Sequence, residues 1–199
     1  MLLPDLLTVA TDSAYIPSKI KFLTERSQKQ TLVLNGREKI TLRHHKNAFV
    51  GCFSLRLRKN INWELFKLWK EKRYPSVTEQ MARDFIPYIV NHYDLITTAP
   101  PSSKRDPLRY CTYDLARAIS AKTGIPFVPA FQKKTDKSYH GRHESLKQSK
   151  PKLLNSWNIH NRAILFIDDC ITTGTTARLC YEALIALGNH IDGLIWVSA

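Results

Sequence analysis

The fold is decided by one stretch of the sequence, Ile164-Leu165-Phe166-Ile167-Asp168-Asp169-Cys170-Ile171-Thr172-Thr173-Gly174-Thr175-Thr176. It opens in a near-continuous apolar run, Ala163 to Ile167, of the kind found in strands that are buried on both faces of a parallel sheet. Two acids, a turn rich in hydroxyl groups and a helical pattern from Thr175 to Leu187 follow, with Gly188 as the expected C-cap. The stretch therefore predicts a strand, a turn and a helix of an α/β protein.

The turn has the composition of a phosphate-binding site. A helix N-terminus offers free backbone N–H groups and the positive end of the helix dipole, and open α/β sheets bind ligands at the carboxyl ends of their strands. Gly174 would let the backbone approach a ligand closely. Threonines here can also serve as N-caps or in local turns, and these roles are compatible with phosphate binding. The hydroxyl donors would be Thr172, Thr173, Thr175 and Thr176.

Asp168 and Asp169 need a different partner, because two carboxylates beside a phosphate cradle would repel the phosphate. They suit the vicinal hydroxyls of a sugar or a bound Mg²⁺. A helix-capping acid pair is the purely structural alternative. We expect ligand contact, because the acids, the turn and the helix start occur together in this order.

The stretch resembles the phosphoribosyl pyrophosphate (PRPP) signature of the type I phosphoribosyltransferases. The resemblance implies the fold of that family, an α/β fold in which helices flank a parallel sheet. It also implies that Asp168 and Asp169 contact the ribose 2- and 3-hydroxyls and lie near the Mg²⁺ that PRPP carries, as indirect metal ligands. The 5-phosphate would be held by Ile171, Thr172, Thr173, Gly174, Thr175 and Thr176.

A second loop fits the resemblance. The predicted strand from Asp94 to Thr98 runs into Ala99-Pro100-Pro101-Ser102-Ser103-Lys104-Arg105, where the family places a pyrophosphate-binding loop. Hydroxyl and cationic donors suit phosphate oxygens, whereas a proline-rich surface turn is the structural alternative. The candidates are Ser102 and Ser103 for PRPP binding, and Lys104 and Arg105 for catalysis.

The polar, basic segment 131–157 lies where the family keeps a flexible loop that closes over PRPP and supplies cations to the leaving pyrophosphate. Lys133 and Lys134 are the catalytic candidates, with Lys137 and Arg142 as further bases. A solvated loop whose bases contact nothing is an equally good interpretation for any one of them.

The chain is predicted to divide at about residue 60. Residues 31–42 predict a β-hairpin around Asn35-Gly36, and residues 48–57 are again rich in strand formers. Residues 1–60 are therefore expected to form a small β-rich appendage, or hood, that selects the acceptor. Residues 61–199 are expected to form the PRPP-binding core, in which strands and helices alternate.

Several core elements carry local signals. Ser76 and Glu79 match a capping box, which predicts a helix from there to about His92 with a kink at Pro87. A helix is also expected over 63–70, and another from Leu108 to Lys122 with Gly124 as its C-cap. Strands are expected over 125–128 and 191–197.

Composition limits the function classes. The 199 residues include 30 Lys and Arg against 17 Asp and Glu, a net charge of +13, which favours polyanionic partners. The excess lies in residues 1–60, with 11 bases and 4 acids, and in residues 101–160, with 12 bases and 4 acids. Without a membrane-length apolar run, a basic signal region or a C-x-x-C pair, the sequence predicts a cytoplasmic protein with reduced thiols and no membrane partner.

From about residue 57 the chain also resembles ComF-type proteins linked to DNA uptake, through the order of elements, the loop at 100–105, the acid pair and the Thr135…Leu146…Asn155 spacing. It lacks the four-cysteine zinc module and the arginine-rich loop spacing that those proteins usually have. Salvage enzymes of the hypoxanthine-guanine type carry an acid where Thr172 stands, and threonine cannot replace a carboxylate base. Adenine, orotate, uracil and non-nucleobase acceptors are all compatible with a threonine at this position.

Two functions follow from these patterns. The first is a Mg²⁺-dependent phosphoribosyltransferase that transfers phosphoribose from PRPP to a nitrogenous acceptor and releases pyrophosphate. The second is a non-catalytic PRPP-sensing or nucleic-acid-binding protein on the same fold, whose basic residues 1–60 would contact a phosphate backbone. Because members of the family often pair, a homodimer is also expected.

Overall fold

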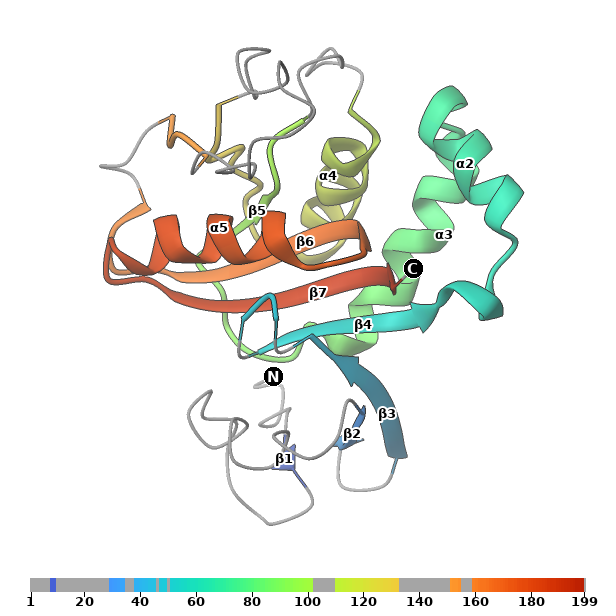
Figure 1. The fold of residues 1–199 in the computed structure, drawn as a ribbon, viewed down its shortest axis with the longest axis horizontal. Helices are drawn as coiled ribbons and strands as arrows, with labels where there is room; N and C mark the ends of the chain where they lie inside the picture. Colours follow the sequence, from blue (N-terminus) through green and yellow to red (C-terminus); the bar gives the residue numbers. More distant parts are fainter. Residues whose placement is uncertain are drawn as a thin grey trace, which may run out of the picture.

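A computed structural model describes residues 8–9, 29–34, 38–45, 47–49, 51–101, 110–132, 151–154 and 159–198. The described strands form one seven-stranded sheet, in the order β1-β2-β3-β4-β7-β6-β5 (Figure 1). The strands are β1 (Thr8–Val9), β2 (Lys29–Leu34), β3 (Glu38–His44), β4 (Cys52–Leu57), β5 (Leu95–Thr98), β6 (Ala163–Ile171) and β7 (His190–Ser198). The helices are α2 (Trp63–Lys72), α3 (Pro75–Phe85), α4 (Cys111–Thr123) and α5 (Thr175–Ile185), with 3₁₀ turns η1 (Arg58–Asn60) and η2 (Ile86–Tyr88).

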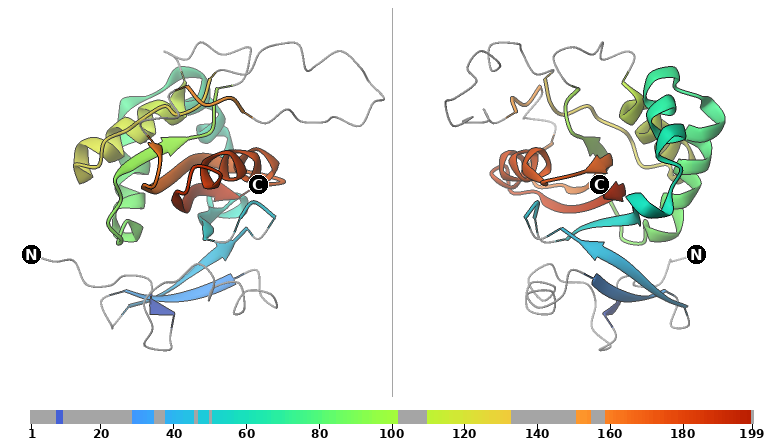
Figure 2. Two further views of the ribbon diagram at one scale, coloured as in Figure 1. Left: turned by 90° about the vertical axis from the view of Figure 1, so that its left-hand side faces the viewer. Right: turned by 45° about the vertical axis from the view of Figure 1, so that its right-hand side comes forward.

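The sheet has a parallel and an antiparallel part. Strands β4, β7, β6 and β5 are parallel neighbours, and Phe127 adds an isolated parallel bridge to Ile96 of β5. Strands β1, β2 and β3 pair antiparallel, and β3 joins them to β4. Figure 2 shows these three strands projecting from the body formed by the helices and the parallel strands. The parallel strands flanked by helices confirm the predicted α/β class.

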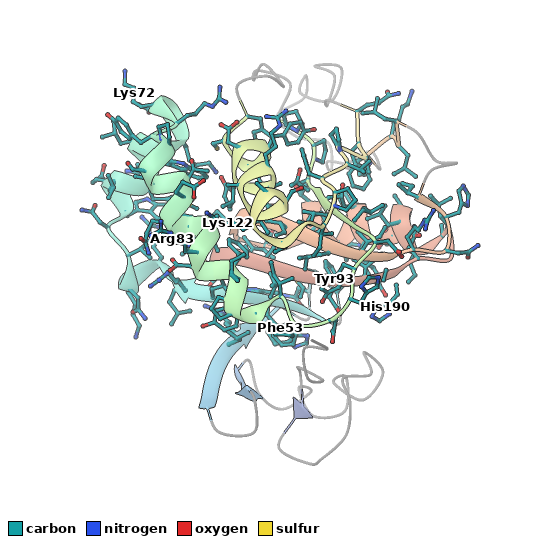
Figure 3. The ribbon with its side chains drawn as sticks, turned by 180° about the vertical axis from the view of Figure 1, so that it is seen from behind. Phe53, Lys72, Arg83, Tyr93, Lys122 and His190 are labelled. Carbon is teal, nitrogen blue, oxygen red and sulfur yellow. The ribbon has the colours of Figure 1, made fainter. Side chains whose placement is uncertain are left out.

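Side chains of β6 alternate between two cores. Ile164 and Phe166 pack into the core that includes Leu184 of α5. Leu165 and Ile167 pack into the other core, together with residues of α3 and α4. Figure 1 shows α5 in front of the sheet, and Figure 3, from behind, shows α3 and α4 covering the opposite face. A strand buried on both faces needs apolar residues at successive positions, which explains the unbroken apolar run.

The predicted hairpin is confirmed, since β2 and β3 pair antiparallel from Lys29 with Arg43 to Leu34 with Glu38. Strand β4 then pairs antiparallel with β3 and parallel with β7. The chain before residue 60 therefore supplies one strand to the parallel part of the sheet. The division into a hood and a core at this residue stays a prediction.

Helix α3 begins and ends earlier than the sequence predicted. It starts at Pro75 without a side-chain capping bond, so the expected capping box at Ser76 is wrong. Proline suits the first helical position, because its φ angle is fixed and the N–H that it lacks would be unpaired there. The helix ends at Phe85, and Pro87 lies in η2 instead of kinking a helix that reaches His92.

The remaining core elements follow the predicted order. Helix α4 ends at Gly124, which has a φ of 74°. The expected strand at 125–128 is reduced to a bridge, in which Ile96 donates to Pro126 O at 2.8 Å and accepts from Val128 N at 2.9 Å. None of the helices seen in the described ranges has the length and apolar character needed to cross a membrane.

Candidate functional site

Strand β6 continues beyond its apolar run and carries both acids within its paired part. Asp168 is the register partner of Ile195 in β7, and Ile171 is the partner of Ser198. Successive side chains of a strand point to opposite faces of the sheet. Asp169 therefore lies on the face covered by α3 and α4, whereas Asp168 lies on the face covered by α5. The sequence placed the end of this strand at Ile167 and did not reveal this separation.

Asp169 is buried and ion-paired, with 3% of its surface exposed. Its Oδ2 lies 2.8 Å from Nζ of Lys70 in α2 and accepts a hydrogen bond from Sγ of Cys111, at the start of α4, over 3.7 Å. Burial would lower the pKa of Lys70, but its ion pair with Asp169 outweighs burial and the pKa is raised. Lys70 is therefore a cation at neutral pH, and its charge faces Asp169.

Asp168 is held differently. Its Oδ1 accepts a hydrogen bond from the backbone N–H of Asp169 at 2.9 Å, and no cation lies within ion-pair distance of it in the part of the chain that the structure describes. Burial, and after it the charge of Asp169, raise the pKa of Asp168 to about 8, although Lys70 opposes the shift. Tyr110, just before α4, also has a raised pKa because of burial and then of Asp168. One lysine thus faces two crowded carboxyl groups.

The turn after β6 depends on a glycine. Gly174 has a φ of 78°, and its carbonyl accepts the backbone N–H of Arg178 at 2.9 Å as α5 begins. A Cβ at this position would lie 3.1 Å from the backbone nitrogen of Ala48, a tight contact that adds to the strain of the positive φ. Glycine at the N-cap position provides no capping side chain, so the first turn of α5 can direct N–H groups at an anion. Next to it, the hydroxyls of Thr173 and Thr175 lie 3.0 Å apart.

The structure brings the predicted residues of the acid pair and the turn to the carboxyl edge of the parallel strands. They differ in exposure, from buried Asp169 to exposed Thr173. Buried apolar packing of Ile171 anchors the start of the turn, and the threonines after it range from half-buried to exposed. The other predicted residues of the turn at this edge are Thr172, Gly174, Thr175 and Thr176.

The predicted pyrophosphate loop starts and ends at this same edge. Strand β5 is parallel to β6 and ends at Thr98, so the chain leaves the sheet at the carboxyl edge. It returns at Tyr110, whose pKa responds to both acids. The candidates within it lie outside the described residues, and their roles stay predictions: Ser102, Ser103, Lys104 and Arg105.

Residues near the two ends of the basic segment 131–157 pair with each other. Phe131 and Leu153 form an antiparallel bridge, in which Gln132 donates to Lys152 O at 2.8 Å and Leu154 donates to Ala130 O at 2.7 Å. The chain reaches this bridge from the parallel contact at residue 127, in the direction of the carboxyl edge. Between the two halves of the bridge, the candidate bases lie outside the described residues: Lys133, Lys134, Lys137 and Arg142.

The sequence interpretation missed Lys70. Phe66 and Trp69 are the buried residues of α2, and Lys70 follows Phe66 by four positions, which puts both on one face of the helix. Its Nζ lies 5.3 Å from the centre of the Phe66 ring. A lysine on the buried face of an amphipathic helix was the available signal, because such a cation usually has a partner. Nothing in the spacing identified Asp169 as that partner.

The acid pair fits a magnesium ion that arrives with its ligand. The carboxylate of Asp169 already faces Lys70, whereas among the described residues no cation pairs with Asp168. Mg²⁺ in phosphate sites is typically held by one or two carboxylates together with phosphate oxygens and water. Asp168 would be the main protein ligand, directly or through water, and the ion would supply positive charge to the phosphates.

Solved structures that are similar to this chain include the two proteins named below. No protein-family model matches the chain, and no curated protein matches it. The UMP synthase of Leishmania donovani is 19% identical over 63% of this chain and 23% of its own, with a TM-score of 0.42. The hypoxanthine phosphoribosyl transferase of Trypanosoma cruzi is 18% identical over 64% of this chain and 63% of its own, with a TM-score of 0.38. The chain thus spans less than two thirds of the length of either protein, and at these low TM-scores neither likeness decides its function.

Proposed function

We propose that this protein is a Mg²⁺-dependent phosphoribosyltransferase that binds PRPP at the carboxyl edge of its parallel strands. It would transfer phosphoribose to a nitrogenous acceptor and release pyrophosphate. The observation that carries the proposal is the junction of β6 and α5. There, two adjacent carboxyl groups, one of them ion-paired with Lys70, lead directly into a glycine turn and a helix N-terminus.

The parts of this junction suit the parts of PRPP. The turn from Ile171 to Thr176 would bind the 5-phosphate through backbone N–H groups and threonine hydroxyls, as helix N-termini do. The acid pair would accept hydrogen bonds from the ribose hydroxyls, because a carboxyl oxygen accepts such bonds whether or not the group carries its proton. Pyrophosphate would lie towards the loop between Thr98 and Tyr110, where Ser102, Ser103, Lys104 and Arg105 are the proposed donors.

The chemistry needs no covalent intermediate with the protein. As pyrophosphate leaves, positive charge develops on the ribose, and a carboxylate at the sugar stabilises it better than water does. Fixed donors at the phosphate hold the ribose in line with the acceptor, which lowers the entropic cost of the reaction. The segment between Phe131 and Leu153 would then exclude water from the site, with Lys133 and Lys134 facing the leaving group.

A nucleic-acid-binding or PRPP-sensing protein is the second candidate. It is favoured by the exposed cations Arg58 and Lys59 in η1, directly after β4. The guanidinium of Arg58 lies 4.5 Å from the centre of the Trp63 ring, an arrangement that can contribute to a surface for stacked bases. Retention of DNA or RNA that weakens steeply with salt would support this candidate.

The test of the enzyme is release of pyrophosphate from Mg²⁺–PRPP in the presence of adenine, orotate, uracil and other nitrogenous acceptors. Asp168→Asn is expected to abolish PRPP binding, because it removes the carboxylate that faces the ribose. Glu64→Gln is the matched control, since Glu64 is an exposed acid that pairs only with neighbouring Lys67 in the described structure. Absence of pyrophosphate release with every acceptor would reject the enzyme, and unchanged PRPP affinity in Asp168→Asn would reject the site.

A further inference from the structure

The contact between Lys70 and Asp169 joins α2 to the end of β6. The two residues are far apart in the sequence, and the Nζ–Oδ2 distance is 2.8 Å. The side chain of Asp169 is 4% exposed and that of Lys70 is 28% exposed, so water screens this pair only weakly. The ion pair is therefore part of the packed structure and differs from the exposed pairs on the surface of the molecule.

Helix α2 holds Lys70 in place. Its N-terminus is capped by the side chain of Asn62, which accepts the backbone N–H of Leu65 at 3.0 Å. Next to Lys70, the indole of Trp69 is completely buried and donates to the hydroxyl of Thr78 in α3 at 2.8 Å. The backbone that carries Lys70 is thus fixed on two sides, so its ammonium group is directed at the end of β6 without a large entropic cost.

The backbone of Asp169 connects this ion pair to Asp168. The N–H of Asp169 donates to Oδ1 of Asp168 at 2.9 Å, so the placement of one acid fixes the side chain of the other. Because β6 is still extended here, the two side chains leave the strand towards different faces. Asp169 is engaged by Lys70 on the α2 side of the sheet, opposite the face covered by α5.

We infer that the two acids have different roles: Asp168 contacts the ribose hydroxyls, while Asp169 is a positioning residue that Lys70 neutralises and holds. This inference rests on the proposed function. Lys70 would serve PRPP binding in two ways. It cancels one of two negative charges near a ligand that is itself strongly negative, and it fixes the backbone N–H that orients Asp168.

The experiment measures the affinity of the full chain for Mg²⁺–PRPP by calorimetry, with thermal unfolding of each variant in parallel. Lys70→Met is expected to weaken binding about tenfold to 100-fold, because Asp169 is left with an uncompensated charge. Lys70→Arg is expected to restore binding to within about threefold, since it keeps the charge. Asp169→Asn alone should also weaken binding about tenfold, because it removes the carboxylate whose charge Lys70 balances.

The double variant Lys70→Met with Asp169→Asn decides the question. Replacing both charges of a buried pair is often neutral, so PRPP affinity should return to within about threefold of the original chain. Asp168→Asn should weaken binding by about 100-fold or more, and adding Lys70→Met should not restore it. Thermal unfolding confirms that each compared variant is folded, and Lys67→Met provides a surface control on the same helix.

A double variant that binds as weakly as Asp168→Asn would show that Asp169 itself contacts the ribose, and the division of roles would be wrong. Lys70→Met that binds like the original chain would show that Lys70 positions nothing. Both results leave the proposed function standing, because the original chain still binds PRPP. If the original chain binds no PRPP, the proposed function and this inference fall together.

Discussion

Buried carboxyl groups lie at both ends of the parallel strands, and the two ends satisfy them differently. At the amino end, Asp192 of β7 is 3% exposed, and its Oδ2 accepts hydrogen bonds from the hydroxyl of Tyr93 at 2.8 Å and from the amide of Asn91 at 3.3 Å. His190 lies 3.8 Å away, and its hydrogen bond to Asp192 raises its pKa. Figure 3 shows Tyr93 and His190 beside each other, far from Lys72 at the end of α2.

At the carboxyl end two carboxyl groups compete for one lysine. Asp169 takes the ion pair, and Asp168 is left with a pKa raised to about 8 by burial and by its neighbour. The amino end thus uses the hydroxyl of Tyr93 and the amide of Asn91 to tie the segment before β5 to β7. The carboxyl end instead places two acids next to each other, and Lys70 pairs with only one of them in the described residues. A strongly perturbed group at the ligand-binding edge of an α/β sheet is typical of a functional site, which supports the proposed PRPP site at the carboxyl end.

The largest effect on stability is expected from Lys70→Met. It leaves Asp169 buried without its counter-ion, and breaking a buried pair from one side typically costs about 3–5 kcal/mol. Urea unfolding at pH 7 measures the change. Lys67→Met, whose partner Glu64 is exposed, should change the free energy of unfolding by less than about 1 kcal/mol. Equal losses in the two variants would mean that the carboxyl end is no more tightly coupled than the surface.

Asp168→Asn should separate function from stability. It is expected to lower PRPP-dependent turnover by about 100-fold or more, because the amide cannot ionise to stabilise the positive charge that develops on the ribose. Yet it should make the protein more stable in alkaline solution. The raised pKa of Asp168 means that the folded state disfavours the ionised carboxylate, and asparagine has no charge to disfavour.

The pH dependence follows from the same shift. The folded state retains a proton on Asp168 between the ordinary aspartate pKa of 3.8 and about pH 8. Its contribution to stability is therefore complete at low pH and is lost as the pH rises through about 8. Unfolding free energies at a series of pH values should fall over this range in the original chain, and the fall should be smaller in Asp168→Asn. Identical profiles would contradict the raised pKa.

Tyr93→Phe probes the amino end. It removes one hydrogen bond to a buried carboxylate and should destabilise the protein by about 1.5–3 kcal/mol. Because Tyr93 lies at the edge opposite the proposed PRPP site, the affinity of the folded protein for PRPP should not change. A loss of affinity at temperatures where the variant is fully folded would mean that the two ends are not independent.

The smallest effect is expected from a pair of glycine substitutions. Gly124 and Gly174 have φ values of 74° and 78°, so alanine at either position costs about 1–2 kcal/mol of backbone strain. Only at Gly174 would the added Cβ also meet another residue, Ala48, at 3.1 Å. Gly174→Ala should therefore be the more destabilising of the two and should alone weaken PRPP binding. Chemical unfolding measures the stability of the two variants, and calorimetry measures their affinity for PRPP. Equal effects of the two substitutions would contradict a specific role of the Gly174 turn in PRPP binding.

Local patterns predicted the elements that depend on neighbouring residues. The apolar run of β6, the Asn-Gly hairpin and the Gly124 cap were readable, because each is set by side chains close in the sequence. The capping box at Ser76 failed, because Pro75 starts the helix one residue earlier. Contacts between residues far apart in the sequence could not be predicted. The spacing of residues does not indicate that β4 pairs with β7 or that Lys70 pairs with Asp169. The acceptor, the homodimer and the cytoplasmic location stay predictions.

The position of β7 has a consequence for how the protein is made. This strand lies between β4 and β6, and both of these precede it in the chain. During synthesis, the ribosome therefore releases two strand edges that can pair with β7 only after β7 itself has emerged. Such long-range pairing slows folding and leaves open edges that invite aggregation, so the nascent chain is expected to benefit from a chaperone until β7 is inserted.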